Sequence, residues 1–282
     1  MNCIICENKL NKYSENSNLE MPVYYCKNCN YYVTGESEIE IEQKLNKLYS
    51  GAYWDERKAK ISIDSNYTDN DSLGKLRNWT SQFSYCKKFF QNKKSILEIG
   101  VGGGQAVYQF DQKGYTITGI EPDSRNVELI NKKLKNGKVI HSFIENIDMD
   151  ESFDIIWMSH VLEHLISPKI FLENIKNVMD KNSVFFIEVP NAENKNTLET
   201  SIFLNPHIFH FSKKSLIKLA ELSGYDVISS DYFRPARKIE GLINKLNKII
   251  KNRDFYEYYP RIKTNNANGI DLRIIIKLSN FD

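Results

Sequence analysis

The sequence lacks long apolar runs and lacks a strong excess of charge of either sign. It has no stretch of 18 or more consecutive apolar residues, and its first residues do not form a basic region followed by an apolar run. We therefore expect neither a membrane span nor a signal peptide. The 38 Lys and Arg residues nearly balance the 36 Asp and Glu residues, whereas broad nucleic-acid-binding surfaces usually carry a clear basic excess. We expect a cytoplasmic protein and do not expect nucleic acid as its partner.

Cysteine is scarce, and its arrangement argues against a disulfide framework. Four of the five cysteines form two knuckles, Cys3-x-x-Cys6 and Cys26-x-x-Cys29, with nineteen residues between them. In a reducing compartment such knuckles are typical zinc ligands. Residues 1–36 contain too few apolar residues to build a core unaided, so zinc binding by thiolates would supply the missing folding energy. We predict a structural zinc ribbon there. The alternative is four thiols without metal on a flexible N-terminal segment.

The rest of the chain alternates between two kinds of pattern. Strand-like segments interleave with helical patterns: the strands are at 95–99, 116–120, 139–143, 153–159, 184–189, 226–230 and 272–278, and the helices at 104–113, 124–135, 168–180 and 212–223. Such alternation is typical of a parallel sheet with helices on both faces. We predict an α/β, Rossmann-like sheet of seven strands over residues 93–282, with an insertion at about 232–271. Residues 37–92 are predicted to form a helical linker and lid.

A glycine-rich turn follows the first of these strands. The strand ends in Glu98-Ile-Gly100-Val-Gly102-Gly-Gly104 and runs straight into a helical pattern. Glycines at such a turn let the backbone bend sharply and let a ligand lie against it. The next strand ends in Glu121, twenty-one residues after Gly100, where a carboxylate can bind both hydroxyls of a ribose. Glu98 would repel a pyrophosphate but is tolerated near a cationic amino acid, which disfavours NAD.

These motifs, together with three segments downstream, resemble the class I S-adenosylmethionine-dependent methyltransferases. Phe153–Pro168 is similar to the fourth strand of that family and the helix after it. Val189–Asn191 resembles the end of the fifth strand, and His207–Leu216 the next segment. The resemblance covers about residues 90–231. It implies a Rossmann-like methyltransferase fold with S-adenosylmethionine as the cofactor.

The resemblance also implies a set of cofactor contacts. Gly100 and Gly102 would lie against the methionine part of the cofactor, and Glu98 would lie where the chain enters this loop. Glu121 would bind the ribose. The adenine would lie between Phe143 and Ile144. Many relatives have an acidic residue at this adenine contact, so the two apolar residues are a departure from the family pattern.

The segment after the strand at 153–159 contains His160, Glu163 and His164. Spacings of three and four would put the three side chains on one face of a helix, as divalent-cation ligands. Ubiquinone-pathway O-methyltransferases are similar here, with an acidic residue in place of His160, and their triad binds a divalent metal. A metal could chelate a substrate hydroxyl, whose pKa lies far above 7. Alternatively, His160 lines the cofactor pocket while Glu163 and His164 cap or pack the helix.

Two further histidines, His207 and His210, follow Pro206. We expect this turn to lie over the C-terminal ends of the strands, where α/β active sites form. Either histidine could be a fourth metal ligand or the general base, and His160 is a third candidate for the base.

Several features bear on the acceptor. The Asn/Asp-Pro-Pro-aromatic motif of base-amine methylation and the Cys pattern of cytosine carbon methylation are absent, so oxygen fits best and nitrogen second. The aromatic and basic run 255–261 could stack on a sugar and pair with phosphates. The wider resemblance includes sugar methyltransferases with N-terminal zinc ribbons. We favour O-methylation of a sugar or nucleotide-linked sugar in polysaccharide or natural-product biosynthesis. An RNA base methyltransferase, a non-catalytic cofactor-binding scaffold and an NAD-dependent oxidoreductase remain alternatives.

Overall fold

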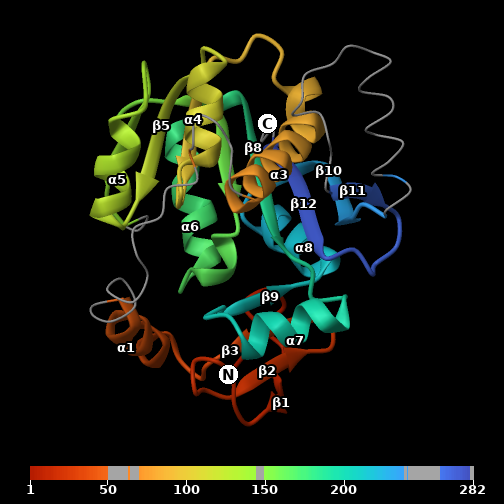
Figure 1. The fold of residues 1–282 in the computed structure, drawn as a ribbon. Helices are drawn as coiled ribbons and strands as arrows, with labels where there is room; N and C mark the ends of the chain where they lie inside the picture. The colour runs from red at the N-terminus through yellow and green to blue at the C-terminus, as the bar shows by residue number, and fades with distance from the viewer. Residues whose placement is uncertain (50–62, 64–69, 144–148, 238–239, 241–260, 280–282) are drawn as a thin grey trace.

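A computed structural model describes most of the chain, namely residues 1–49, 63, 70–143, 149–237, 240 and 261–279 (Figure 1). Ile144, predicted to contact adenine, lies outside the described residues. So do residues 255–260, which make up all but the last residue of the aromatic and basic run. Among the described residues, no helix combines the length and the apolar character needed to cross a membrane.

Within the described residues the main sheet has eight strands, in the order β11-β10-β12-β8-β7-β4-β5-β6. They are β4 (Ser95–Ile99), β5 (Thr116–Glu121), β6 (Lys138–His141), β7 (Phe153–Ser159), β8 (Met179–Pro190), β10 (Tyr225–Pro235), β11 (Arg261–Thr264) and β12 (Asp271–Leu278). Strands β4 to β8 pair in parallel, whereas β12 is antiparallel to both β8 and β10. The predicted Rossmann-like α/β sheet is confirmed. Strand β11, in the predicted insertion, extends the expected seven strands by pairing with β10 at one edge.

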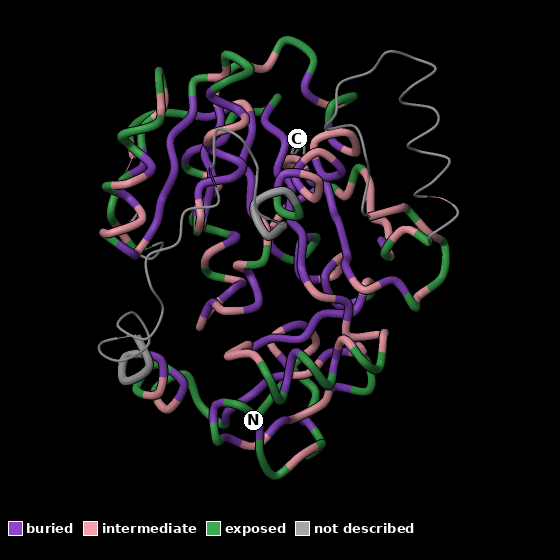
Figure 2. The backbone as a smooth tube through the Cα atoms, viewed as in Figure 1, coloured by how far each residue is buried: buried purple, intermediate pink, exposed green. Residues whose placement is uncertain are grey.

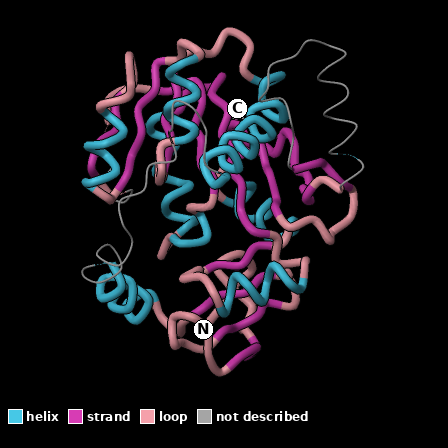
Figure 3. The backbone as a smooth tube through the Cα atoms, in the orientation of Figure 1, coloured by secondary structure: helices cyan, strands magenta, loops and turns pink. Residues whose placement is uncertain are grey.

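Helices cover both faces of this sheet (Figure 3). The described helices are α1 (Glu38–Tyr49), α3 (Asn70–Cys86), α4 (Gln105–Gln112), α5 (Ser124–Asn131), α6 (Pro168–Asn174), α7 (Lys195–Phe203) and α8 (Lys213–Leu222), with 3-10 turns at Lys87–Phe89, Leu162–His164 and Ile175–Val178. Of these, α1 and α7 lie below the main sheet (Figure 1). Successive strand residues point to opposite faces. Ile155 and Trp157 pack with α3, α4 and α5, whereas Ile156 and Met158 pack with α6 and α8. Each large side chain buried in this way contributes about 1.5–3 kcal/mol.

Short polar motifs begin several of the helices. At the start of α5 the Asp123 side chain accepts a hydrogen bond from the backbone N–H of Arg125. At the start of α7 the Asn194 side chain accepts one from the backbone N–H of Thr197. Ser212 and Ser215 form a reciprocal capping box before α8. Such caps satisfy backbone N–H groups that have no partner inside the helix.

The N-terminal segment forms a second, smaller sheet that includes a strand from the main domain. Its order is β1 (Asn11–Ser14), β2 (Val23–Cys26), β3 (Tyr31–Thr34) and β9 (Phe209–Phe211). The β3–β9 pairing is antiparallel and places Tyr32 opposite His210. Sequence patterns predicted neither β9 nor the neighbouring helix α7.

This second sheet and one face of the main sheet share one apolar core. Figure 2 shows that buried residues run through both parts. Buried residues of the ribbon, such as Met21 and Val33, belong to the same cluster as Ile208 and Leu216 of the main domain. The ribbon is thus packed against the main sheet, and β9 and α7 lie between them (Figure 1).

Candidate functional site

The glycine-rich turn after β4 adopts the backbone conformation that its glycines permit. Gly100 has a φ of +72°, and a Cβ atom added there would lie 2.3 Å from Cγ2 of Val161. The backbone N–H groups of Gly100 and Val101 donate to the carbonyl of Ile120 at 3.0 and 3.2 Å. A larger residue at position 100 would therefore both strain the backbone and displace the neighbouring segment.

Two buried acids flank this turn. Glu98 is 5% exposed, and its Oε2 atom has no hydrogen-bond partner; burial raises its pKa well above the usual value. Glu121 accepts hydrogen bonds from the backbone N–H groups of Gly102 and Asp123 at 2.6 and 3.0 Å. Burial also raises the pKa of Glu121. Carboxylate oxygens have further lone pairs, so both acids retain capacity to bind polar groups of a ligand.

A cavity of about 470 Å³ lies between α3 and the glycine-rich turn. Its described lining consists of Gly74, Lys75, Asn78, Trp79, Gln82, Glu98, Gly100, Val101, Gly102, Gly103, Gln105, Ala106, Trp157, Ser159, His160 and Arg261. We call it the cofactor cavity, because it holds the predicted Glu98, Gly100 and Gly102. Phe143 is 50% exposed beyond the end of β6 and is not part of this lining. Its predicted contact with adenine stays a prediction.

A second cavity, of about 580 Å³, meets the first at His160, which lines both. Most of its lining is amide, hydroxyl or ionisable, and the residues are His160, Pro190, Asn194, Asn196, Thr197, Thr200, Ser201, Asn205, His207, Ile270 and Asp271. We call it the acceptor cavity. As expected, it lies at the C-terminal ends of parallel strands, where β7 and β8 end next to His160 and Pro190.

His160 lies between two buried carboxylates. Its Nδ1 atom is 3.3 Å from Glu163 Oε1 and its Nε2 atom is 3.3 Å from Glu188 Oε1. Burial alone would lower the pKa of His160, but hydrogen bonding and charge attraction from both acids raise it well above 6.5. The role of His160 as the general base stays a prediction.

Glu188 contacts both His160 and a group of polar side chains buried within the sheet. It is fully buried and hydrogen-bonded to Arg273, which stands directly opposite on β12, and to Gln82 at 2.5 Å. Arg273 also donates to Ser81 at 3.0 Å. Sequence reasoning missed this group. The sequence did contain a signal, an acid at position 188 and an arginine at position 273, each inside an otherwise apolar strand. Such charges indicate a buried pair, because buried charges are rare unless paired.

Glu163 and His164 lie in a 3-10 turn, Leu162–His164, and not on the predicted α-helix. His160 precedes the turn with a φ of +56°, so the helical-spacing argument for the three side chains was wrong. Glu163 is fully buried, and its Oε1 atom lies 3.3 Å from His160 Nδ1. Ligand atoms of Glu163, His164 and His207 lie within 4.8 Å of one another. These three could hold a divalent cation, and a role for His160 in that set stays a prediction.

His207 and His210 occupy different environments. His207 is half-buried in the acceptor cavity, and burial lowers its pKa to about 4. His210 is 2% exposed and contacts Ser201 Oγ at 2.7 Å and Thr34 Oγ1 at 3.1 Å. His210 lies behind Ser201 and is in the lining of neither cavity. It is therefore not placed to act directly on an acceptor as the base.

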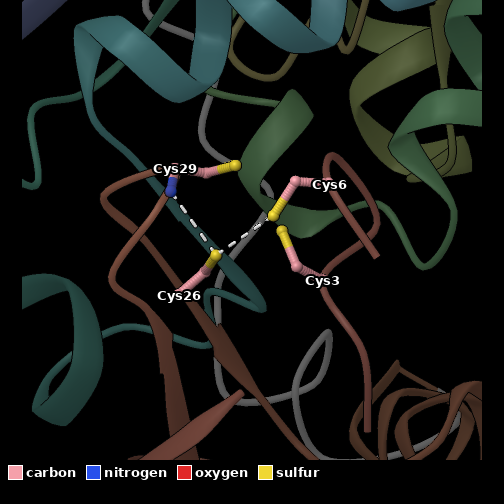
Figure 4. A group of neighbouring side chains, drawn as sticks. All are labelled: Cys3, Cys6, Cys26 and Cys29. Carbon is pink, nitrogen blue, oxygen red and sulfur yellow. Dashed lines mark hydrogen bonds between the residues drawn. The ribbon is translucent and has the colours of Figure 1, made fainter. Parts of the chain in front are cut away.

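The four cysteines of the ribbon face a common centre (Figure 4). Their sulfur atoms all lie within 4.8 Å of one another, and those of Cys6 and Cys26 are 3.6 Å apart. Burial raises the pKa of Cys3 to about 11 and also raises that of Cys29. Four thiolates cannot share so small a space without a compensating cation. Four converging sulfurs fit tetrahedral zinc.

The chain matches a known protein family over more than half of its length. A family profile described as a methyltransferase domain matches residues 72–230. The ubiquinone biosynthesis O-methyltransferase of Rickettsia conorii is 25% identical in an alignment 166 residues long that covers 50% of this chain and 57% of that enzyme. The enzyme of the same name from Bradyrhizobium sp. is 26% identical in an alignment 160 residues long that covers 52% of this chain and 60% of that enzyme.

Solved structures show the same fold. A SAM-dependent methyltransferase from Archaeoglobus fulgidus aligns with a TM-score of 0.52 and 19% identity, covering 74% of this chain and all of that one. The 1,6-didemethyltoxoflavin-N1-methyltransferase of Burkholderia thailandensis, solved with its substrate and S-adenosylhomocysteine, aligns with a TM-score of 0.57 and 12% identity. That alignment covers 91% of this chain and 99% of the other.

Proposed function

Because the chain belongs to the methyltransferase-domain family, we propose that it transfers a methyl group from S-adenosylmethionine to a hydroxyl of a sugar or nucleotide-linked sugar. The observation that carries this proposal is the meeting of two cavities at His160. One contains the glycine-rich turn and the other is lined by polar side chains. Placing donor and acceptor in adjoining cavities aligns them for transfer, which is the main task when the donor is already activated.

The residues around the glycine-rich turn fit the cofactor. S-adenosylmethionine, when bound, supplies an electrophilic methyl group on a sulfonium. Glu121 would accept from the ribose hydroxyls while its bonds to Gly102 and Asp123 hold it in place. The unpartnered Oε2 of Glu98 offers a buried acceptor for a polar group of the cofactor. Open backbone at Gly100 and Gly102 would admit the methionine part.

The acceptor cavity supports a polyhydroxylated acceptor. Its lining presents amides and hydroxyls that can each donate and accept, from Asn194, Asn196, Thr197, Thr200, Ser201 and Asn205. Its apolar side chains are Pro190 and Ile270. These side chains could bind the hydroxyls of a sugar ring, because buried hydroxyls need hydrogen-bond partners.

The acceptor's proton needs a destination, and His207 is the best-placed group. Its ring is neutral at pH 7, because burial lowers its pKa to about 4, and it lines the acceptor cavity. The nearby Glu163 carboxylate, which is fully buried, would stabilise the positive charge that His207 gains. His160 would keep its proton between Glu163 and Glu188 and orient the junction of the two cavities.

A cation at Glu163, His164 and His207 is the alternative way to activate the hydroxyl. A divalent metal held there would lower the pKa of a chelated hydroxyl. The two roles of His207 exclude each other, because one ring nitrogen cannot both bind a metal and accept a proton. Activity that survives exhaustive chelation with the ribbon intact would favour the base.

A phenolic acceptor is the second candidate. The relatives from Rickettsia conorii and Bradyrhizobium sp. are named as O-methyltransferases of ubiquinone biosynthesis. A phenol ionises more readily than a sugar hydroxyl and would depend less on the base.

The first test is transfer of isotope-labelled methyl from S-adenosylmethionine to a panel of sugar nucleotides and catechols. We expect label on a sugar nucleotide, and loss of transfer by at least about a hundredfold in His207→Ala, within the range for general-base removal. His141→Ala is the matched control, because His141 is exposed on β6. Label on catechols alone would overturn the sugar proposal. Cofactor binding without transfer to any acceptor would favour a scaffold.

We further propose that residues 1–36 form a structural zinc ribbon and that residues 37–92 serve as linker and cofactor lid. The convergence of four cysteine sulfurs supports the first part. The contribution of α3 residues such as Trp79 and Gln82 to the cofactor cavity supports the second.

A further inference from the structure

The side-chain amide of Gln82 lies next to His160, where the two cavities meet. Gln82 belongs to α3 and lines the cofactor cavity. Its Nε2 atom is 2.5 Å from Glu188 Oε1, and His160 Nε2 is 3.3 Å from that same oxygen. Because His160 lines both cavities, Gln82 lies beside the junction that a transferred methyl group has to face.

The carboxylate of Glu188 fixes which way round this amide lies. Glu188 is hydrogen-bonded to the permanently charged Arg273, so it is the ionised partner of a buried pair and its oxygens only accept. The atom of Gln82 that faces Glu188 is therefore the nitrogen, because an amide oxygen would be repelled there. The second N–H of this nitrogen donates to Ser159 Oγ at 2.9 Å, and Ser159 donates to Glu188 Oε1 at 3.2 Å.

This arrangement leaves the amide oxygen of Gln82 for a ligand. Both N–H groups are used, and within the part of the chain that the structure describes no hydrogen bond reaches Oε1. Nor is Oε1 one of the polar atoms that are sealed off from solvent without a partner. The oxygen, with its partial negative charge, is thus open to the cavity that the side chain lines.

We propose that the amide oxygen of Gln82 contacts the methylated sulfonium of S-adenosylmethionine and distinguishes it from the neutral sulfur of S-adenosylhomocysteine. The methyl hydrogens share the sulfonium charge, and C–H groups make weak hydrogen bonds to carbonyl oxygens. The methyl end of the cofactor is the part beside Gln82, because it has to face the junction at His160. Glu188 is the positioning residue that turns the oxygen toward it.

Such a contact would favour the charged donor over the product that remains after transfer, so the product would be released more readily. The inference rests on the proposed binding of S-adenosylmethionine in the cofactor cavity. It does not depend on the identity of the acceptor, and its test needs no acceptor.

The test compares three ligands that differ at one position, by calorimetry on the full chain at one fixed pH near neutrality. They are S-adenosylmethionine, S-adenosylhomocysteine and sinefungin, in which a carbon bearing a protonated amine replaces the methylated sulfur. We expect the wild type to bind sinefungin at least about tenfold more tightly than S-adenosylhomocysteine, because a charge-assisted hydrogen bond is strong. S-adenosylmethionine should bind about three- to fivefold more tightly than S-adenosylhomocysteine, because C–H contacts are weaker.

Gln82→Met keeps the length of the side chain and removes the amide. It should lower the preference for sinefungin over S-adenosylhomocysteine by about tenfold, while the affinity for S-adenosylhomocysteine itself changes less than about threefold. Ser81→Ala is the matched control. Ser81 precedes Gln82 on α3 and accepts from Arg273 in the same buried network at 3.0 Å, but it is not in the cavity lining. Its variant should keep the wild-type preference.

An equal loss of affinity for all three ligands in Gln82→Met would overturn the inference, because the side chain would then contact a part that the ligands share. A preference that persists in Gln82→Met, or falls equally in Ser81→Ala, would also contradict it. If Gln82→Met does not fold, the wild type decides, since sinefungin bound no more tightly than S-adenosylhomocysteine would exclude the oxygen from that position. Failure of the wild type to bind any of the three would overturn the proposed cofactor as well, whereas binding without preference would overturn this inference alone.

Discussion

The cofactor cavity and the acceptor cavity adjoin at His160 but are built in different ways. Much of the first comes from one stretch of chain, residues 98–106, together with α3, and the backbone of its glycine-rich turn is available to a ligand. The second comes from segments near 160, 190–207 and 270, and its key histidines are held by side-chain hydrogen bonds. The second should therefore depend on single side chains and on the ribbon, whereas the first should depend on backbone shape.

Disrupting the proposed zinc site should have the largest effect and should impair the acceptor cavity while sparing the cofactor cavity. In Cys26→Ser one of four converging sulfurs is lost, and structural zinc supplies about 10–16 kcal/mol to comparable small sites. We expect loss of zinc, increased hydrogen exchange in β3, β9 and α7, and loss of methyl transfer. S-adenosylhomocysteine affinity, measured by calorimetry, should remain within a few-fold of the wild type.

Cys86→Ser is the matched control, because Cys86 is buried away from the cluster and should leave the zinc content unchanged. If Cys26→Ser abolished cofactor binding as well, the two cavities would not be separable in the way proposed. If it retained one equivalent of zinc, the four-sulfur site would be wrong.

The buried pair beneath His160 provides the next test. Arg273→Met would remove the buried arginine partner of the Glu188 carboxylate, and breaking such a pair typically costs about 3–5 kcal/mol. Urea unfolding should show a loss of this size. A double variant, Arg273→Met with Glu188→Leu, should lose less than the sum of the single changes, because the uncompensated charge is gone.

An exposed ion pair is the control for that measurement. Lys132 pairs with Glu128 at 2.6 Å, and both side chains are mostly exposed, so Lys132→Met should leave the unfolding midpoint unchanged. A loss in Arg273→Met no larger than in Lys132→Met would show that the buried network does not support the acceptor side.

A backbone change should affect the cofactor side selectively. Gly100→Ala places a Cβ in a left-handed conformation and against Val161, where a non-glycine residue costs about 1–3 kcal/mol. We expect S-adenosylhomocysteine affinity to fall at least about tenfold, a change of about 1.4 kcal/mol. Gly114→Ala has similar strain, with a φ of +80° but no atom within 4 Å of the added carbon. Equal losses of affinity in both variants would mean that the turn has no special role.

The same contrast explains what the sequence could predict. Glu98, Gly100 and Gly102 are close in sequence, so their spacing alone was enough to predict that they belong to one site. The spacing of Cys3 and Cys29 from their partners, each in a Cys-x-x-Cys pair, likewise predicted a metal site. Glu188 and Arg273 are 85 residues apart and meet only through the register of β8 with β12.

The histidines lie between these extremes. Their residue type marked His160 and His207 as candidates for chemistry, but their protonation depends on neighbours from other segments. Glu163 and Glu188 raise the pKa of His160, and His210 lies outside the lining of both cavities because β9 pairs with β3. A local helical pattern could not reveal either fact, and it also suggested a helix where the chain forms a 3-10 turn.

The smallest effect concerns the pH dependence of stability. Burial lowers the pKa of His210 to about 3 from an ordinary value of 6.5. Between these values the unfolded chain binds a proton that the folded chain does not, so the unfolding free energy falls as the pH is lowered from about 6.5. The slope from this one residue is about 1.4 kcal/mol per pH unit.

His210→Gln keeps a hydrogen-bonding side chain but removes the titrating group. The difference in unfolding free energy between wild type and this variant should therefore shift in favour of the variant by about 2 kcal/mol between pH 7 and pH 5. His141→Gln serves as the control, because His141 is exposed on β6. If the difference between wild type and His210→Gln is constant over this range, His210 is not held neutral by burial. Water would then reach the hydrogen-bonded histidines behind the acceptor cavity more freely than their burial indicates.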